Sequence, residues 1–239
     1  MSSSFFYFKE FTVRQRDSAM KIGTDGVLLG AWTALSSLTT SVLDVGTGTG
    51  LIALMLAQRF PSITIDAIEL DPTAAQEAQY NFDQSPWRDR LHCIPSSLKE
   101  YALNAGKVYD HIVCNPPFYS GSYTIEERRR DQARNQLFLP LDQFFEGANQ
   151  LLSDTGSLSV ILPIAQKEIA MAEAAKNGLF LSHFTAVKGT ATAAVKRALL
   201  LFTRQEFSCE TTSLTLELKR HQRTDEHQEL VKAFYLAKP

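Results

Sequence analysis

The chain has 239 residues, of which 44% are hydrophobic and 21% charged, and its formal net charge is -2. This composition is typical of a soluble globular protein, and the charge excludes a global basic field for nucleic acid, although a local basic patch would suffice. Cys93, Cys114 and Cys209 are scattered without metal-ligand spacing, so we expect reduced thiols, no metal and a cytoplasmic protein. Neither a signal peptide nor a membrane-spanning run is expected.

Strands and helices alternate in the predicted elements from residue 41 onward. A polar turn and an apolar helix over residues 17–32 come first, with Thr24 or Asp25 as the candidate N-cap. Ser213–Lys219 is a possible additional strand. The remaining predicted strands lie at 41–45, 63–69, 91–95, 109–114, 157–162, 179–187 and 197–204, and the helices at 51–59, 72–83, 141–152, 165–177 and 226–236.

This order predicts an α/β fold with a doubly wound, Rossmann-like, mostly parallel sheet of seven strands. The loop between the strands at 179–187 and 197–204 is too short for a parallel crossover, so one strand near the C-terminus should be antiparallel. No repeat or long linker divides the chain. We therefore expect a single domain over residues 1–239, with an N-terminal segment (1–40), an insert (119–140) and a C-terminal extension (205–239).

A glycine-rich turn follows the first strand of this sheet, in VLDVGTGTG. Gly46, Gly48 and Gly50 let the backbone approach a ligand where a Cβ would clash. Their GxGxG spacing differs from the GxGxxG of dinucleotide enzymes, which binds a pyrophosphate. Asp44, just before the turn, is either a buried acceptor for the turn amides or a partner for a cofactor's amino group.

Glu69 ends the second strand, about where an acidic residue accepts the two ribose hydroxyls of a nucleoside cofactor. Its alternative role is to cap the helix that begins at Pro72, which Asp71 could do instead. The glycine turn and Glu69 together favour a nucleoside cofactor without a pyrophosphate, S-adenosylmethionine. The turn at 17–25 could then cover the amino-acid end of this cofactor, with Lys21 facing its carboxylate or lying in solvent.

The most informative motif is Asn115-Pro116-Pro117-Phe118, at the end of the strand at 109–114. Two consecutive prolines make the backbone rigid. The Asn115 amide oxygen can accept a hydrogen bond from an exocyclic NH2, while Phe118 stacks on the plane that carries it. The alternative interpretation is a stiff loop with an Asn cap, and the motif alone does not decide between them.

In combination, VLDVGTGTG, Glu69 and NPPF resemble the class I S-adenosylmethionine-dependent methyltransferases with an amino-methylation motif. The segments FTVRQRDSAMKIGTDGVLLGAW, QSPWRDRL, NPPFY, QAR and KRALLLF further resemble the bacterial tRNA1(Val) (adenine-37-N6)-methyltransferases, over nearly the whole chain. Similar proteins carry an Asp near the cofactor adenine where this chain has the uncharged Ser97. The resemblance implies cofactor contacts from Lys21, Thr24, Asp25, Asp44, Gly46, Gly48, Gly50, Glu69, Leu70 and Ser97.

The resemblance also implies a mechanism at the NPPF motif, with segment 1–40 covering the cofactor and the insert on the substrate side. The Asn115 side-chain oxygen and the Pro116 carbonyl accept the two N6 hydrogens of an adenine beside the anticodon, Pro117 stiffens the turn, and Phe118 stacks on the base. Basic residues near the motif would bind the anticodon arm of tRNA, unless they are only solvated surface. The predicted RNA contacts are Tyr119, Arg128, Arg129, Arg130, Arg134, Lys196 and Arg197.

Other classes of protein compete with this interpretation. A nicotinamide dehydrogenase fails on the glycine spacing and leaves NPPF unexplained. A protein-glutamine N5-methyltransferase, or another N6-adenine nucleic-acid methyltransferase, shares NPPF and the cofactor. A non-catalytic RNA-binding module would need neither Asn115 nor the glycine turn. With no long exposed apolar stripe, a monomer is expected.

Overall fold

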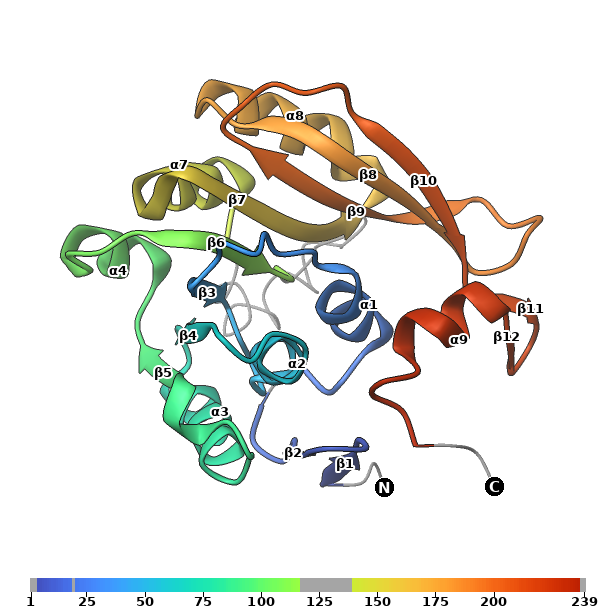
Figure 1. Cartoon of the computed structure of the whole chain (residues 1–239), viewed down its shortest axis with the longest axis horizontal. Helices are drawn as coiled ribbons and strands as arrows, with labels where there is room; N and C mark the ends of the chain where they lie inside the picture. Colours follow the sequence, from blue (N-terminus) through green and yellow to red (C-terminus); the bar gives the residue numbers. More distant parts are fainter. Residues whose placement is uncertain (1–3, 19, 117–138, 237–239) are drawn as a thin grey trace, which may run out of the picture.

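The computed structural model describes residues 4–18, 20–116 and 139–236. Its centre is an eight-stranded sheet in the order β10-β8-β9-β7-β6-β3-β4-β5 (Figure 1). The two halves of the fold meet at β3, which pairs with β4 on one side and β6 on the other. The strands are β3 Ser41–Val45, β4 Thr64–Glu69, β5 Leu91–Pro95, β6 Tyr109–Cys114, β7 Leu152–Pro163, β8 Phe180–Lys188, β9 Val195–Thr203 and β10 Glu210–Thr215.

The sheet confirms the predicted α/β fold and its antiparallel strand near the C-terminus. All ladders from β5 to β7 are parallel, and β9 is antiparallel to both of its neighbours, β7 and β8. The possible additional strand at 213–219 overlaps the end of β10, which pairs in parallel with β8 and raises the seven expected strands of this sheet to eight. The last residues of the predicted range form a separate short strand, β11 (Glu217–Lys219). Four of its six residues are exposed, so the edge strand carries little hydrophobic pattern in the sequence.

Helices cover both faces of the sheet, as a doubly wound fold requires. Helices α1, α2 and α9 lie on one face and α4, α7 and α8 on the other, and each face has its own apolar core (Figure 1). Leu28 and Met55 belong to the first core, Phe144 and Phe145 to the second. The helices are α1 Thr24–Trp32, α2 Leu51–Arg59, α3 Pro72–Asp83, α4 Leu98–Asn104, α7 Leu141–Leu151, α8 Lys167–Lys176 and α9 Asp225–Val231.

Several short elements lie outside the predictions. The hairpin of β1 (Phe5–Tyr7) and β2 (Thr12–Arg14), strand β12 (Gln222–Arg223), which pairs with β11, and helix α4 were not expected. The N-cap prediction for α1 was wrong. Gly23 occupies that position, without a side-chain cap, and Thr24 and Asp25 are the first two residues of the helix itself. The Asp25 carboxylate pairs with Arg197.

Three arginine side chains stabilise the ends of helices or the loops that follow them. Arg59 and Arg90 are partly desolvated, which lowers the pKa of each guanidinium, and Arg204 reaches back to the end of α7. Backbone carbonyls at a helix C-terminus lack intrahelical partners, so these cations satisfy them directly. Arg59 donates to the carbonyls of Gly30 and Thr33, Arg90 to those of Ala57, Phe60 and Ile63, and Arg204 to those of Asn149, Leu152 and Ser153.

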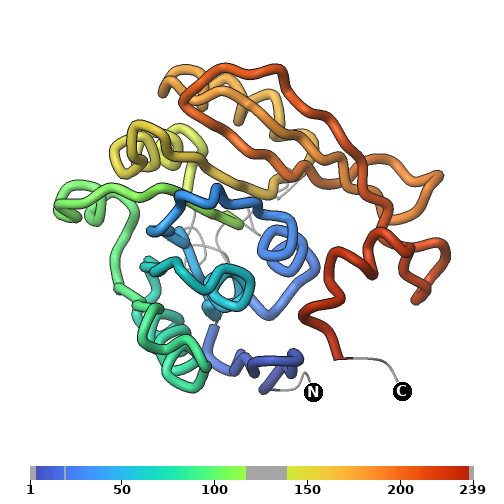
Figure 2. The backbone as a smooth tube through the Cα atoms, in the orientation of Figure 1, coloured from blue at the N-terminus to red at the C-terminus, as the bar shows by residue number. Residues whose placement is uncertain are grey.

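The β1–β2 hairpin and the end of the chain after α9 lie side by side (Figure 2). The backbone N–H of Lys9 donates to the carbonyl of Phe234 at 2.8 Å. The rings of Phe8 and Tyr235 stack with centroids 5.8 Å apart. The N-terminal segment is therefore anchored by the C-terminal one.

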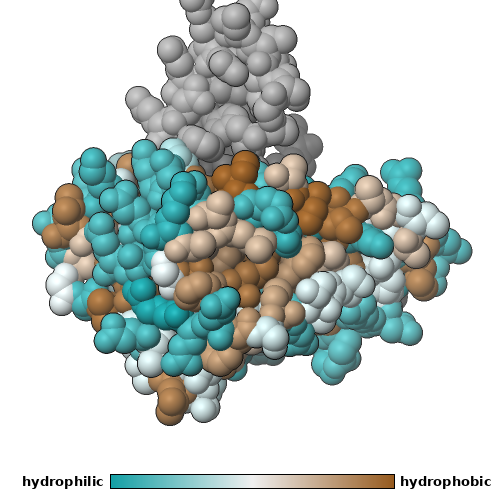
Figure 3. All heavy atoms as spheres, turned by 90° about the horizontal axis from the view of Figure 1, so that it is seen from above, coloured by the Kyte–Doolittle hydropathy of each residue, from teal (hydrophilic) through white to brown (hydrophobic). Residues whose placement is uncertain are grey.

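The face that carries α8 mixes polar and apolar residues, with an apolar area near its middle (Figure 3). Ile169 of α8 and Phe207, in the loop after β9, are more than half exposed. Helix α8 is therefore covered by protein on one side only. In the part of the chain that the structure describes, no helix has the length and apolar character needed to cross a membrane, and no group of three metal-ligating side chains occurs.

Candidate functional site

Two adjoining cavities open at the carboxyl ends of the parallel strands β3, β4 and β6. The first has a volume of about 350 Å³ and the second of about 830 Å³. Because β9 runs against β7, its beginning reaches the same edge of the sheet. Predicted site residues line both: Gly46, Gly48, Glu69, Leu70, Ser97, Asn115 and Pro116 the first, and Lys21, Thr24, Asp25, Gly46, Gly48, Asn115 and Arg197 the second.

The glycine turn after β3 adopts a conformation that only glycine takes without strain. Gly46, Gly48 and Gly50 have φ values of 68°, 57° and 80°. A Cβ on Gly46 or Gly48 would meet no atom within 4 Å, whereas one on Gly50 would lie 2.5 Å from the Phe82 ring. Gly48 thus leaves room for a ligand, and Gly50 instead permits close packing at the start of α2.

Glu69 is held in place by two backbone donors. Its Oε2 accepts from the Gly48 amide at 2.9 Å and its Oε1 from the Asp71 amide at 3.0 Å. Asp71, not Glu69, caps α3, because its Oδ1 accepts from the Thr73 amide at 2.8 Å. The carboxylate of Glu69 is therefore fixed at the wall of the first cavity, with acceptor capacity left for a ligand hydroxyl.

Asp44 lies beneath the glycine turn and is fully buried. Burial raises its pKa to about 7, against the opposing effect of the Thr47 hydroxyl, which donates to its Oδ2 at 2.6 Å. The negative charge of Glu69 raises the pKa further. Asp44 lines neither cavity among the described residues, and its Oδ1 makes no hydrogen bond to any of them, so both of its predicted roles stay predictions.

Asn115 stands between the two cavities and lines both. Its Oδ1 is buried and makes no hydrogen bond to any residue that the structure describes. A buried acceptor without a partner costs free energy, roughly 1–3 kcal/mol, and at a cavity wall this acceptor is available to a ligand that donates. The adjacent Pro116 is buried against the first cavity. The arrangement suits an amino group presented to the end of β6.

Ser97 lines the first cavity, but its hydroxyl also serves α4. It accepts from the Glu100 amide at 3.1 Å and donates to the Glu100 carboxylate at 2.9 Å. The Ser97 backbone N–H also donates to that carboxylate, at 3.3 Å, which completes a capping box. The serine that stands in for the family's Asp is therefore already hydrogen-bonded to protein. A contact between Ser97 and the cofactor adenine stays a prediction.

The residues expected near the amino-acid end of the cofactor line the second cavity. The ammonium of Lys21 donates to the backbone carbonyl of Gln15. Asp25 pairs with Arg197 at 2.7 Å, so a residue predicted for the cofactor touches one predicted for RNA. Lys196 is exposed and does not line either cavity. Pro117, Phe118, Tyr119, Arg128, Arg129, Arg130 and Arg134 lie outside the described residues.

Sequence reasoning missed several residues that line the cavities. Ser18 and Met20 belong to the polar turn that was expected to cover a cofactor, and Ser96 and Leu98 flank Ser97, so neighbouring signals pointed to them. Gln166 follows β7 and reaches the site because that strand ends at the same edge of the sheet. The other missed residues include Ala74, Lys99 and Gln143 in the first cavity and Thr47, Thr49, Pro163 and Ala165 in the second.

The family described as "Methyltransferase small domain" matches residues 22–188, more than half of the chain. A tRNA1(Val) (adenine(37)-N6)-methyltransferase of Flavobacterium psychrophilum is 47% identical over 97% of this chain and 99% of its own length. The protein of the same name from Bacteroides fragilis is 40% identical over 99% of both chains. The chain belongs to the tRNA1(Val) (adenine(37)-N6)-methyltransferase family. It is therefore an enzyme that transfers methyl groups.

The solved structures support the same fold. A predicted O-methyltransferase from Agrobacterium tumefaciens superposes with a TM-score of 0.68, covering 88% of this chain and 96% of its own. At 16% identity, this likeness shows the fold alone. The class I methyltransferase fold expected from the glycine turn and the strand order is thus confirmed, while the roles of single residues stay predictions.

Proposed function

We propose that this protein transfers a methyl group from S-adenosyl-L-methionine to the exocyclic N6 of adenine 37 in tRNA1(Val). The observation that carries the proposal is the Oδ1 of Asn115, which has no hydrogen-bond partner among the described residues and lies between two cavities at the carboxyl end of β6. An amide oxygen in that place accepts an amino hydrogen. The names of the relatives, at 40–47% identity over nearly the full length, supply the tRNA and the position of the adenine.

The first cavity has the features that S-adenosylmethionine requires. Gly48 presents backbone without a side chain, and Glu69 holds two carboxylate oxygens at the wall, where they suit the ribose hydroxyls. Leu70 and Leu98 offer apolar surface for the adenine ring. Ser18 and Met20 line the first cavity, and residues 20–25 line the second, where the amino-acid end would lie. When bound, S-adenosylmethionine supplies the methyl group on its sulfonium.

Asn115 and Pro116 make the N6 amine reactive by orienting it. The lone pair of an adenine amino group is delocalised into the ring, so the amine is a weak nucleophile. Hydrogen bonds from N6 to the Asn115 Oδ1 and the Pro116 carbonyl favour a pyramidal nitrogen whose lone pair points at the methyl group. The same oxygens stabilise the positive charge that develops on N6 during attack, and the extra proton leaves afterwards.

The substrate side of the site begins at the second cavity. Arg197 lines it, and Lys196 is exposed beside it at the start of β9. These cations suit phosphates of an anticodon arm, whose unstacked loop bases are readily turned outward into a protein pocket. The predicted arginines of the insert would extend this surface. A tRNA substrate also implies a cytoplasmic location.

The experiment that tests the proposal offers the enzyme a choice of substrates. Purified protein with methyl-labelled S-adenosylmethionine is incubated with unmodified tRNA1(Val), unmodified double-stranded DNA and an unmodified release-factor protein. We expect label in the tRNA alone, as N6-methyladenine at position 37. Label in the protein would instead indicate the glutamine methyltransferase of the competing interpretation, and label in DNA would indicate another N6-adenine methyltransferase.

A further inference from the structure

A short N-terminal segment forms part of the wall of both cavities. We call residues 14–18 and 20–22 the strap. Ser18 and Met20 line the first cavity, and Met20, Lys21 and Ile22 line the second. The strap has no regular secondary structure after β2 ends at Arg14, so its path depends on side chains that hold its backbone.

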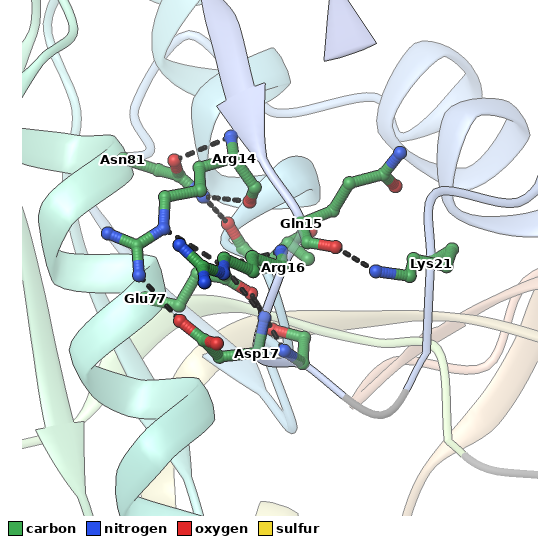
Figure 4. Close-up of polar contacts among 9 residues, drawn as sticks. Arg14, Gln15, Arg16, Asp17, Lys21, Glu77 and Asn81 are labelled. Atoms are coloured by element: carbon green, nitrogen blue, oxygen red, sulfur yellow. Dashed lines mark hydrogen bonds and ion pairs between the residues drawn. The ribbon is translucent and has the colours of Figure 1, made fainter. Parts of the chain in front are cut away.

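Glu77 of α3 binds the strap through three consecutive backbone amides (Figure 4). Its carboxylate accepts from the amides of Arg16 at 2.7 Å, Asp17 at 3.1 Å and Ser18 at 2.8 Å, and from the Ser18 hydroxyl at 2.7 Å. The side chain is buried, with the residue 2% exposed. One buried carboxylate therefore fixes the conformation of residues 16–18.

Asn81, one helical turn further along α3, holds the beginning of the strap (Figure 4). Its Oδ1 accepts from the Arg14 amide at 2.8 Å, and its Nδ2 donates to the Arg14 carbonyl at 2.9 Å. The same Nδ2 donates to the carbonyl of Thr49 at 2.8 Å. Asn81 thus links the strap directly to the glycine turn.

Gln15 ties the far end of the strap back to its beginning. Its side-chain Oε1 accepts from the Ile22 amide at 2.9 Å, and its carbonyl accepts from the Lys21 ammonium. These two bonds hold residues 21 and 22 close to Gln15. Ser18 and Met20 line the first cavity, whose wall α3 itself continues with Ala74, three residues before Glu77.

The charge of Glu77 is part of this arrangement. Burial on its own would raise the pKa of this carboxyl, but the hydrogen bonds from Ser18, Asp17 and Arg16 outweigh burial and hold the pKa below its ordinary value. Arg14 adds an ion pair, with its Nε 3.4 Å from Oε1. Glu77 is thus ionised at neutral pH, and convergent backbone amides of this kind bind anions well.

We propose that Glu77 is a positioning residue for the methyl donor, which acts through the strap and does not touch the donor itself. Among the described residues, Glu77 lines neither cavity, whereas Ser18, which it binds by both backbone and side chain, lines the first. Fixing the strap in advance removes the cost of ordering it when the donor binds. This inference rests on the proposed function, because it takes S-adenosylmethionine as the ligand of the first cavity.

The test is the isosteric substitution Glu77→Gln, with Gln76→Ala as the matched control, because Gln76 is the exposed neighbour on the same helix. Donor affinity is measured by titration calorimetry, and KM for donor, KM for tRNA and kcat by steady-state kinetics. We expect the donor Kd and KM to rise by at least about tenfold in Glu77→Gln, as for lost hydrogen bonds to a charged acceptor. The kcat at saturating donor and the KM for tRNA should stay near the wild-type values.

The split between donor KM and kcat distinguishes positioning from a purely structural role. A mutant that only loses folded protein would lower kcat per total enzyme and leave the donor KM unchanged, and that result overturns the inference. Should Glu77→Gln not fold, Gln15→Ala decides, since it releases Ile22 and leaves Glu77 in place. We expect its donor KM to rise about two- to tenfold, as for one neutral hydrogen bond, and no rise overturns the inference. Wild-type protein that binds no S-adenosylmethionine would overturn the proposed function itself.

Discussion

The Nε of Arg197, at the start of β9, donates to Oδ2 of Asp25, in the first turn of α1, at 2.7 Å. The two residues are 172 positions apart in the sequence and line the same cavity. The side chains of Asp25 and Arg197 are 24% and 35% exposed, so water screens the pair and its contribution to stability is at most about 1 kcal/mol. The pair matters because it joins Asp25, which we expect to contact the cofactor, to Arg197, which we expect to contact RNA.

The substitution Asp25→Asn should change the two affinities in opposite directions. Removing the carboxylate weakens the contact expected with the donor, but leaves the charge of Arg197 without its partner from α1 and more available to phosphate. We expect weaker donor binding, tighter tRNA binding and a steeper decrease of tRNA affinity with salt, by about 0.7–0.9 in the log–log slope for one further phosphate contact. Fluorescence anisotropy at several salt concentrations measures the slope. Arg197→Gln should make it shallower, and equal slopes in all three proteins would refute the RNA role.

Replacing Asn115 by Ala should abolish catalysis while donor binding persists. The change removes the only side-chain acceptor that we assign to N6, so kcat should fall by about 10²-fold or more, as when a donor or acceptor that stabilises developing charge is lost. The donor Kd by calorimetry should change little. Asn104→Ala on the surface of α4 is the matched control. Near-normal turnover in Asn115→Ala would contradict the mechanism.

Asp44 should make stability depend on pH. Its pKa is about 7 in the folded protein and near the ordinary aspartate value of 3.8 when unfolded, so the folded state holds the proton more tightly. The stability that this proton binding contributes is complete below about pH 4 and is lost as the pH rises through about 7. The free energy of unfolding is measured by urea titration without donor, from pH 4 to pH 8, for the wild type and for Asp44→Asn. As the pH rises, the wild type should lose stability relative to Asp44→Asn, and the difference between the two proteins should level off above pH 7. Parallel pH curves would contradict the burial of an ionisable Asp44.

Two glycines of the turn should respond differently to substitution by alanine. Gly48→Ala meets no neighbouring atom and suffers only the left-handed backbone, whereas Gly50→Ala also places its Cβ 2.5 Å from the Phe82 ring. We expect Gly48→Ala to lower the free energy of unfolding by about 1–2 kcal/mol and Gly50→Ala by clearly more. Chemical denaturation measures both. Equal losses would show that Phe82 moves aside at no cost.

Local signals explain which elements could be predicted. Helices 51–59 and 72–83 begin and end where the sequence places them, because a left-handed glycine precedes the first and an Asp-Pro pair starts the second. The strand boundaries of β3, β5 and β6 are likewise confirmed. Helix α4 was missed although the SSLKE segment contains its capping box, because Ser97 was interpreted as a cofactor contact.

The candidate site was predictable where it lies on the turns that follow strands. Asn115, Glu69 and the glycine turn each follow a strand of one parallel sheet, and such strand ends meet at one edge. The role of Glu77 was not predictable, because its partners are backbone amides about 60 positions earlier, and nothing local distinguishes it from a solvated helix glutamate. The same holds for the pairing of Asp25 with Arg197, which depends on how β9 returns to the sheet edge.

The three arginines that bind helix carbonyls change how the charge of this chain should be counted. Arg59, Arg90 and Arg204 carry positive charge in the composition, but their donors already point at carbonyls of the protein's own backbone. A polyanion outside can therefore recruit little of that charge. The attraction between this enzyme and an RNA should depend on the cations around the second cavity. Neutralising Arg90 should therefore alter folding but leave the ionic-strength dependence of complex formation unchanged.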